Sequence, residues 1–124
     1  MSRQDLAQVG ERAARRLLKK RGYRLLATNW RCRQGEIDVV ATHQGVICFI
    51  EVKSQSAGAA VPAVERVTAL KERHLSRAAA EFLRRTGRLD RPCRFDVVSV
   101  VIDRAGGAKA EIIQDAFPAT GPHG

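Results

Sequence analysis

The feature that most constrains the fold of this chain is an apolar run that leads directly into two charged residues. Residues 46–50 read VICFI, and the same extended segment continues to Glu51 and Lys53. A continuous apolar run of this length is typical of a β-strand that is buried on both faces. Ionisable side chains at the end of such a strand cost free energy unless they are paired or bound to a metal ion. Glu51 and Lys53 are therefore expected to have partners.

Hydrophobic periodicity predicts two helices and five strands. Apolar residues recur at helical spacing in two segments and form alternating or short apolar runs in the others. We expect helices at residues 4–20 and 62–85 and strands at residues 23–30, 35–41, 46–53, 94–102 and 109–116. Residues 42–45 are predicted to form a four-residue hairpin loop, and residues 54–61 a longer loop.

The order of these elements, α-β-β-β-α-β-β, describes an α/β fold in which one mixed sheet is flanked by helices. A chain of 124 residues suits one domain of ordinary size. We therefore expect a single domain over residues 1–117 and a frayed C-terminal tail at residues 118–124.

Composition excludes several classes of protein. No apolar run approaches the length of about 20 residues that spans a bilayer, so no membrane association is expected. The cysteines, Cys32, Cys48 and Cys93, form no CxxC pair. This spacing argues against a disulfide scaffold or a zinc ribbon and fits the reducing cytoplasm.

The net charge of +9 is concentrated near the N-terminus. Residues 12–33 contain nine basic residues and no acidic one. A field of this sign attracts polyanions, of which nucleic acid is the usual one in a cytoplasm. The candidates for binding nucleic acid on the first predicted helix are Arg12, Arg15, Arg16 and Lys19. A basic surface without a specific ligand is the alternative interpretation.

Acidic side chains from two neighbouring strands are expected on one face of the sheet. Pairing the strands through the loop at residues 42–45 places Asp38 opposite Phe49, and Glu36 then lies opposite Glu51. Because directly opposed like charges repel, this face needs a compensating cation. Lys53, which projects from the same face, is one candidate, and a divalent metal ion is another.

Each predicted helix adds one charged residue to this face. Glu11 lies at the edge of the apolar arc of the first helix and is expected at the margin of the sheet. Lys71 lies inside the apolar stripe of the second helix, where it must either extend to solvent or meet a carboxylate or a phosphate. Lys71 is therefore a further candidate for binding nucleic acid.

The residue types on this face suit metal-assisted hydrolysis of a nucleic-acid backbone. Asp38 and Glu51 are hard oxygen ligands for Mg²⁺ or Mn²⁺, which polarises a phosphodiester and lowers the pKa of a bound water. Lys53 would orient that water or stabilise developing negative charge, and Glu11 would bind the metal through water or hold a second cation. The predicted catalytic residues are Glu11, Asp38, Glu51 and Lys53, with Asp38 and Glu51 as metal ligands. The spacing alone occurs by chance in many chains, so the shared face carries the prediction.

Several short motifs together resemble one known family. They are Gly10-Glu11, residues 21–23 (RGY), Asn29, residues 35–41 (GEIDVVA), residues 49–53 (FIEVK), Lys71, residues 94–98 (RFDVV) and Ala116-Phe117. This set is similar to that of the YraN-type family of small bacterial proteins. The resemblance implies a restriction-endonuclease-like fold, more distantly similar to archaeal Holliday-junction resolvases and other nucleases with a D…(D/E)xK core.

The resemblance also implies residue roles. Asp38 and Glu51 would be metal ligands, Lys53 the catalytic lysine and Glu11 the acidic residue of the helix, whereas Glu36 belongs to the motif without an assigned role. A homodimer is implied by analogy, because many nucleases of this fold cut two strands as dimers. Gln55 replaces the usual arginine of the family, which weakens a phosphate contact, and the QxxxY motif of the exonuclease variant is missing.

Three functions follow for testing. The first is a metal-dependent endonuclease that acts on DNA, including branched or damaged forms. The second is a module of the same fold that binds nucleic acid through its basic helix face without cutting it. The third is a scaffold for a protein partner. The complete set of two acids and a lysine favours the endonuclease, because a binding module does not require it.

Overall fold

The computed structural model describes residues 2–59 and 68–119. The elements follow in the predicted order α-β-β-β-α-β-β, which confirms the α/β class. Their bounds are α1 Arg3–Lys20, β1 Arg24–Cys32, β2 Gly35–His43, β3 Val46–Ser56, α2 Ala69–Arg85, β4 Cys93–Ile102 and β5 Ala108–Phe117.

The strands form one mixed sheet in the order β1-β2-β3-β4-β5. Adjacent strands are antiparallel except β3 and β4, which are parallel. A parallel pair needs a long crossover, and the connection that contains α2 supplies it. The sheet centre therefore falls on β3, whose residues Ile47–Ile50 are buried, as the apolar run predicted.

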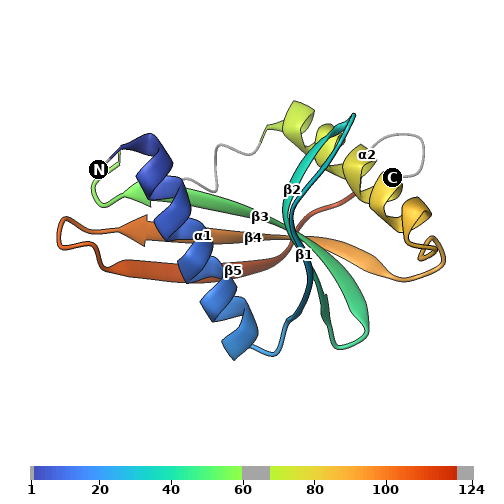
Figure 1. Ribbon diagram of the computed structural model, residues 1–124, viewed down its shortest axis with the longest axis horizontal. Coiled ribbons are helices and arrows are strands. Elements are labelled where there is room, and N and C mark those ends of the chain that lie inside the picture. Colours follow the sequence, from blue (N-terminus) through green and yellow to red (C-terminus); the bar gives the residue numbers. More distant parts are fainter. Residues whose placement is uncertain (1, 60–67, 120–124) are drawn as a thin grey trace.

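The two helices cover opposite faces of the sheet (Figure 1). On one face, Ala14 and Leu18 of α1 pack with Cys48 and Ile50 of β3. On the other, α2 packs against the side chains that alternate with these. The core cluster on this face contains Leu75, Ala78 and Phe82 of α2 together with Phe49 and Phe95 of the sheet. Within the described residues, no helix is long and apolar enough to cross a membrane.

A close contact positions α1 over β3. Gly10 of the helix is buried, and a Cβ atom built on it would lie 1.7 Å from Oγ of Ser54. Only a glycine allows the helix backbone to approach the strand this closely. The contact brings Glu11, the next residue, to the same end of β3 that carries Lys53.

The hairpin between β2 and β3 differs from the prediction. The predicted four-residue loop at 42–45 is a two-residue turn, because His43 pairs with Val46. Gln44 and Gly45 have φ angles of 52° and 82°, a left-handed pair that matches the twist of a tight hairpin. Phe49 consequently pairs with Val40 and not with Asp38. The predicted register was wrong by two residues, and a shift of two leaves every side chain on its predicted face.

Two other boundaries also differ. The predicted loop at 54–61 begins too early, because β3 keeps pairing with β4 as far as Ser56. The helix predicted from Pro62 begins at Ala69, after Thr68, whose backbone is extended and whose side chain accepts a hydrogen bond from the Lys71 amide. Residues 62–67 of that helix and residues 120–124 of the predicted tail lie outside the described residues.

Candidate functional site

The ladder between β2 and β3 ends just where the predicted acidic residues begin. Val39 and Ile50 are the last paired residues, so Asp38 and Glu51 are the next on each strand. Oδ2 of Asp38 accepts a hydrogen bond from the amide of Val52 at 2.8 Å. The carboxylate of Asp38 thus accepts the hydrogen bond that a backbone carbonyl of β2 would accept if the ladder continued. Beyond this point β3 continues its pairing with β4, so both acids stand where β2 and β3 separate.

Glu51 is joined to two lysines. The residue is only 5% exposed. Its Oε1 lies 3.1 Å from Nζ of Lys53 on the same strand and 2.7 Å from Nζ of Lys71 on α2. Lys71 therefore meets a carboxylate, one of the partners that its position in the apolar stripe required. We call Asp38, Glu51, Lys53 and Lys71 the acid–lysine cluster.

Asp38 carries an unusually high pKa. Burial, followed by the charge of Glu51, raises the pKa of its carboxyl from 3.8 to about 7. The charges of Glu11 and Glu36 add to the shift, while the hydrogen bond from Val52 opposes it. The ionised form of Asp38 is therefore unfavourable in this buried, acidic location, and a bound cation would stabilise it.

The two lysines of the cluster are shifted in opposite directions. Burial and the nearby positive charge of Lys71 lower the pKa of Lys53. Burial also opposes the charge on Lys71, but its hydrogen bond to Glu51 and the negative charges of Glu51 and Asp38 outweigh this effect and raise its pKa. Lys71 thus holds its proton firmly, whereas Lys53 releases its proton more readily than an ordinary lysine.

A cavity of about 360 Å³ opens beside the cluster. Glu36, Asp38 and Glu51 line its strand side, and Lys71 and His74 line its helix side. Asp38 and Glu51 therefore border a space that can hold a hydrated ion or part of a larger ligand.

The donor set fits a hard divalent cation with few protein ligands. Asp38 and Glu51 supply carboxylate oxygens, and Mg²⁺ commonly binds one or two carboxylates while keeping waters for a substrate phosphate. Within the described residues, no group of three or more His, Cys, Asp or Glu side chains gathers as a metal site. Glu11 acts on Asp38 through its charge, and Glu36 forms an ion pair with Arg31 at 3.6 Å.

The predicted nucleic-acid-binding residues divide into separate groups. Arg12 and Arg16 line a groove between α1 and β5, whereas Arg15 and Lys19 do not, and Lys71 belongs to the cluster. Lys20 also lines the groove, although the sequence analysis did not select it. Its position four residues after Arg16 is the signal that identifies it, because residues four apart share a helix face.

Comparison with known proteins identifies one family. A family model described as "Uncharacterised protein family UPF0102" matches residues 10–100, a range that contains the whole cluster. The UPF0102 protein of Symbiobacterium thermophilum is 44% identical over 119 residues, covering 96% of this chain and 100% of the relative. That of Moorella thermoacetica is 44% identical over 118 residues, covering 94% and 98%. That of Ectopseudomonas mendocina is 40% identical over 119 residues, covering 95% and 98%. These names specify no activity.

Proposed function

The chain belongs to the uncharacterised UPF0102 (YraN-type) family, and we propose that its acid–lysine cluster is the active site of a metal-dependent endonuclease. The reaction is hydrolysis of phosphodiester bonds in DNA. The proposed cofactor is Mg²⁺ or Mn²⁺.

One observation carries this proposal. Asp38 and Glu51 come from two strands that separate at this point, and Lys53 contacts Glu51 beside an open cavity. Structural ion pairs do not require two carboxylates to share a buried location, and here burial, together with the charge of Glu51, raises the pKa of Asp38 to about 7. A carboxylate with a perturbed pKa, beside a second carboxylate and a cavity, is typical of a catalytic site.

The chemistry divides among the residues. A bound Mg²⁺ or Mn²⁺ would polarise the phosphodiester and lower the pKa of a water molecule. Asp38 and Glu51 would hold the ion. Lys53, whose pKa is lowered, would orient the attacking water or stabilise developing charge on the phosphate. Lys71 would fix the orientation of Glu51, and Glu11, whose charge acts on Asp38, would bind the metal through water or hold a second cation.

The net charge of +9 supports a polyanionic substrate. The proposal includes DNA in branched or damaged form as substrate and the cytoplasm as location. A homodimer remains part of the proposal, by analogy with nucleases of this fold.

A second candidate is a module that binds nucleic acid without cutting it. Glu51 is already neutralised by Lys53 and Lys71, and the described residues offer no third carboxylate ligand in contact with the pair. A cluster whose charges are already paired would stabilise the fold without a metal ion. Basic residues elsewhere would then account for all nucleic-acid binding.

The test is cleavage of supercoiled plasmid and labelled oligonucleotides with Mg²⁺ or Mn²⁺. Asp38→Asn and Lys53→Met should abolish cleavage and retain binding. Glu111→Gln, which removes an exposed carboxylate on β5, is the matched control and should cut normally. If Asp38→Asn cuts as fast as the unaltered protein, the assignment of the acid–lysine cluster as the active site is wrong. If the unaltered protein binds with strong salt dependence but never cuts, the second candidate is correct.

A further inference from the structure

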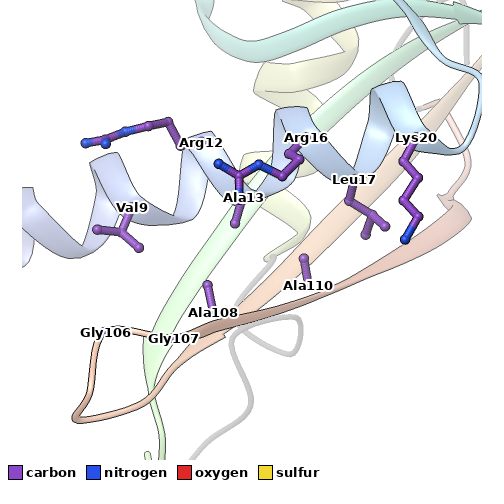
Figure 2. A pocket seen from close by; sticks show the side chains of 10 residues that line it. All are labelled: Val9, Arg12, Ala13, Arg16, Leu17, Lys20, Gly106, Gly107, Ala108 and Ala110. Atoms are coloured by element: carbon purple, nitrogen blue, oxygen red, sulfur yellow. The ribbon is translucent and has the colours of Figure 1, made fainter.

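A second feature lies on the opposite face of the sheet from the acid–lysine cluster. A groove of about 580 Å³ separates α1 from β5 and the turn that precedes it. Figure 2 shows Ala108 and Ala110 of β5 pointing toward the helix and Leu17 and Lys20 of α1 pointing toward the strand. We call this feature the basic groove, because all charged residues among those that line it are basic: Arg12, Arg16 and Lys20.

The three basic residues occur at regular intervals along α1. They are spaced four residues apart, which corresponds to about 6 Å along the helix axis for each step. This separation is comparable with that between neighbouring phosphates of a nucleic-acid strand. None of the three forms an ion pair with an acidic residue of the described chain. Their charge is therefore available to an external anion.

The facing wall is made of small residues. Gly106, Gly107, Ala108 and Ala110 leave space for a chain to lie against the backbone of the hairpin. The amides of Gly106 and Gly107 already donate to the carbonyl and the carboxylate of Asp103. Anion contacts in the groove must therefore come from the side chains of α1.

The lining contains no aromatic residue on which a base would stack. Its apolar floor, which includes Val9, Ala13 and Leu17, suits sugars or the alkyl parts of side chains. The groove is thus built to contact a charged backbone and not to identify bases.

The basic groove is separate from the proposed active site. Glu51 and Lys53 project from the sheet face covered by α2, whereas the groove lies on the face covered by α1. On α1 itself, Glu11 acts on Asp38, while Arg12 already lines the groove. Nothing in the proposed hydrolysis uses these basic residues.

We propose that the basic groove binds the phosphodiester backbone of one nucleic-acid strand, independently of the acid–lysine cluster. The inference rests on the proposed function only for the class of ligand. The regular spacing of the three basic residues and the small residues of the facing wall support the remainder of the proposal.

The experiment measures fluorescence anisotropy of a labelled oligothymidylate and of a labelled duplex of equal length, in EDTA, over a series of KCl concentrations. The test variant is R12Q/R16Q/K20Q. The matched control, R3Q/R21Q/R24Q, removes three exposed basic residues that lie outside the groove. A second variant, Ala108→Glu, places a negative charge on the facing wall. The Asp38→Asn variant reports whether the cluster contributes.

The groove variant should weaken binding at least tenfold more than the control. Its salt dependence, the slope of log K against log[KCl], should fall by about 2 for the single strand, as expected for three lost phosphate contacts. Ala108→Glu should weaken binding in the same direction, and Asp38→Asn should bind normally. The probe that shows the larger loss identifies the form of strand that is held.

Equal binding by the groove variant and the control, with both probes, would overturn the inference. Displacement of the oligonucleotide by polyglutamate of equal charge, as effectively as by unlabelled oligonucleotide, would overturn the assignment to nucleic acid. Neither result depends on cleavage, so a protein that proves inactive as a nuclease still tests the groove. Conversely, normal cleavage by the groove variant would leave the proposed function intact.

Discussion

The ammonium nitrogen of Lys71 lies 2.7 Å from Oε1 of Glu51, and this contact joins helix α2 to the central strand of the sheet. The link closes the acid–lysine cluster from the helix side. Because Lys53 contacts the same oxygen, Glu51 keeps one cationic partner if the other is removed. The two lysines therefore have different structural roles. Lys53 belongs to the strand that carries Glu51, whereas Lys71 also ties two elements together.

Lys71→Met should lower the free energy of unfolding by about 1 kcal/mol. A hydrogen bond to a charged group contributes about 1.5–3 kcal/mol, and the value here is smaller because the Lys71 side chain is 43% exposed. Urea denaturation monitored by circular dichroism measures the change. Lys109→Met, which removes an exposed lysine on β5, is the control and should alter the free energy by less than about 0.5 kcal/mol. Equal effects of the two substitutions would show that the Lys71–Glu51 contact does not stabilise the fold.

Side-chain alternation was enough to predict the face on which Asp38, Glu51 and Lys53 lie. The register error did not affect this result, since a shift of two residues preserves the face. The separation of the strands could not be predicted in the same way. It depends on the hydrogen bond between Asp38 and the Val52 amide, and no pattern of residue types shows where a ladder ends.

The position of Lys71 in an apolar stripe showed that it needs a partner but not which one. Three-dimensional packing selects Glu51, because the parallel pairing of β3 and β4 sets where α2 crosses the sheet. The start of α2 was missed for a different reason. Thr68 caps the helix through its side chain, and such a residue inside a periodic segment is not distinguished from an ordinary helical residue.

The stability of the metal-free protein should decrease as pH rises through the range in which Asp38 titrates. Asp38 has a pKa of about 7 in the folded state and near 3.8 when unfolded, so the folded state binds more protons between these values. The contribution of protonated Asp38 to the free energy of unfolding is therefore fully present below about pH 4 and is lost as pH rises through about 7. Asp38→Asn keeps an oxygen that can accept from Val52 but cannot ionise. The two proteins should be equally stable near pH 4, and at about pH 8 the variant should be more stable by about 2–4 kcal/mol.

Chemical denaturation in EDTA at several pH values measures this difference, with Glu111→Gln as the control for loss of an exposed carboxylate. Parallel stability profiles for the unaltered protein and Asp38→Asn would contradict the raised pKa. Under the proposed function, Mg²⁺ at about pH 8 should reduce the difference, because the ion stabilises only the protein with an ionised Asp38.

The RFDVV motif at residues 94–98 should stabilise the fold and have no direct part in binding. Asp96 is completely buried, and its carboxylate accepts hydrogen bonds from Arg94, from the hydroxyl of Tyr23 and from the amide of Asp115. Asp96→Asn leaves the guanidinium of Arg94 without its charge partner and should lower the free energy of unfolding by about 2–4 kcal/mol. Tyr23→Phe, which removes only the hydroxyl, should cost about 1–2 kcal/mol.

Urea denaturation provides both values, and oligonucleotide anisotropy on the folded variants separates a structural role from a binding one. A change smaller than about 0.5 kcal/mol for Asp96→Asn would show that the network does not stabilise the fold. Loss of binding by well-folded Tyr23→Phe would give this network a part in recognition that its burial argues against.

Gly10→Ala should destabilise the protein even though alanine is the better helix former. Alanine gains about 1 kcal/mol from helix propensity, but its Cβ would lie 1.7 Å from Oγ and 2.8 Å from Cβ of Ser54. Relief requires α1 to move away from β3, which separates Ala14 and Leu18 from the core beneath them. We expect a net loss of about 2 kcal/mol or more, in the range of other overpacked sites. A double-mutant cycle with Ser54→Gly tests the cause, because Ser54→Gly removes both clashing atoms and should restore most of the loss. If Gly10→Ala is equally destabilising with Ser54 and with Gly at position 54, the close approach of α1 to β3 is not what requires glycine at position 10.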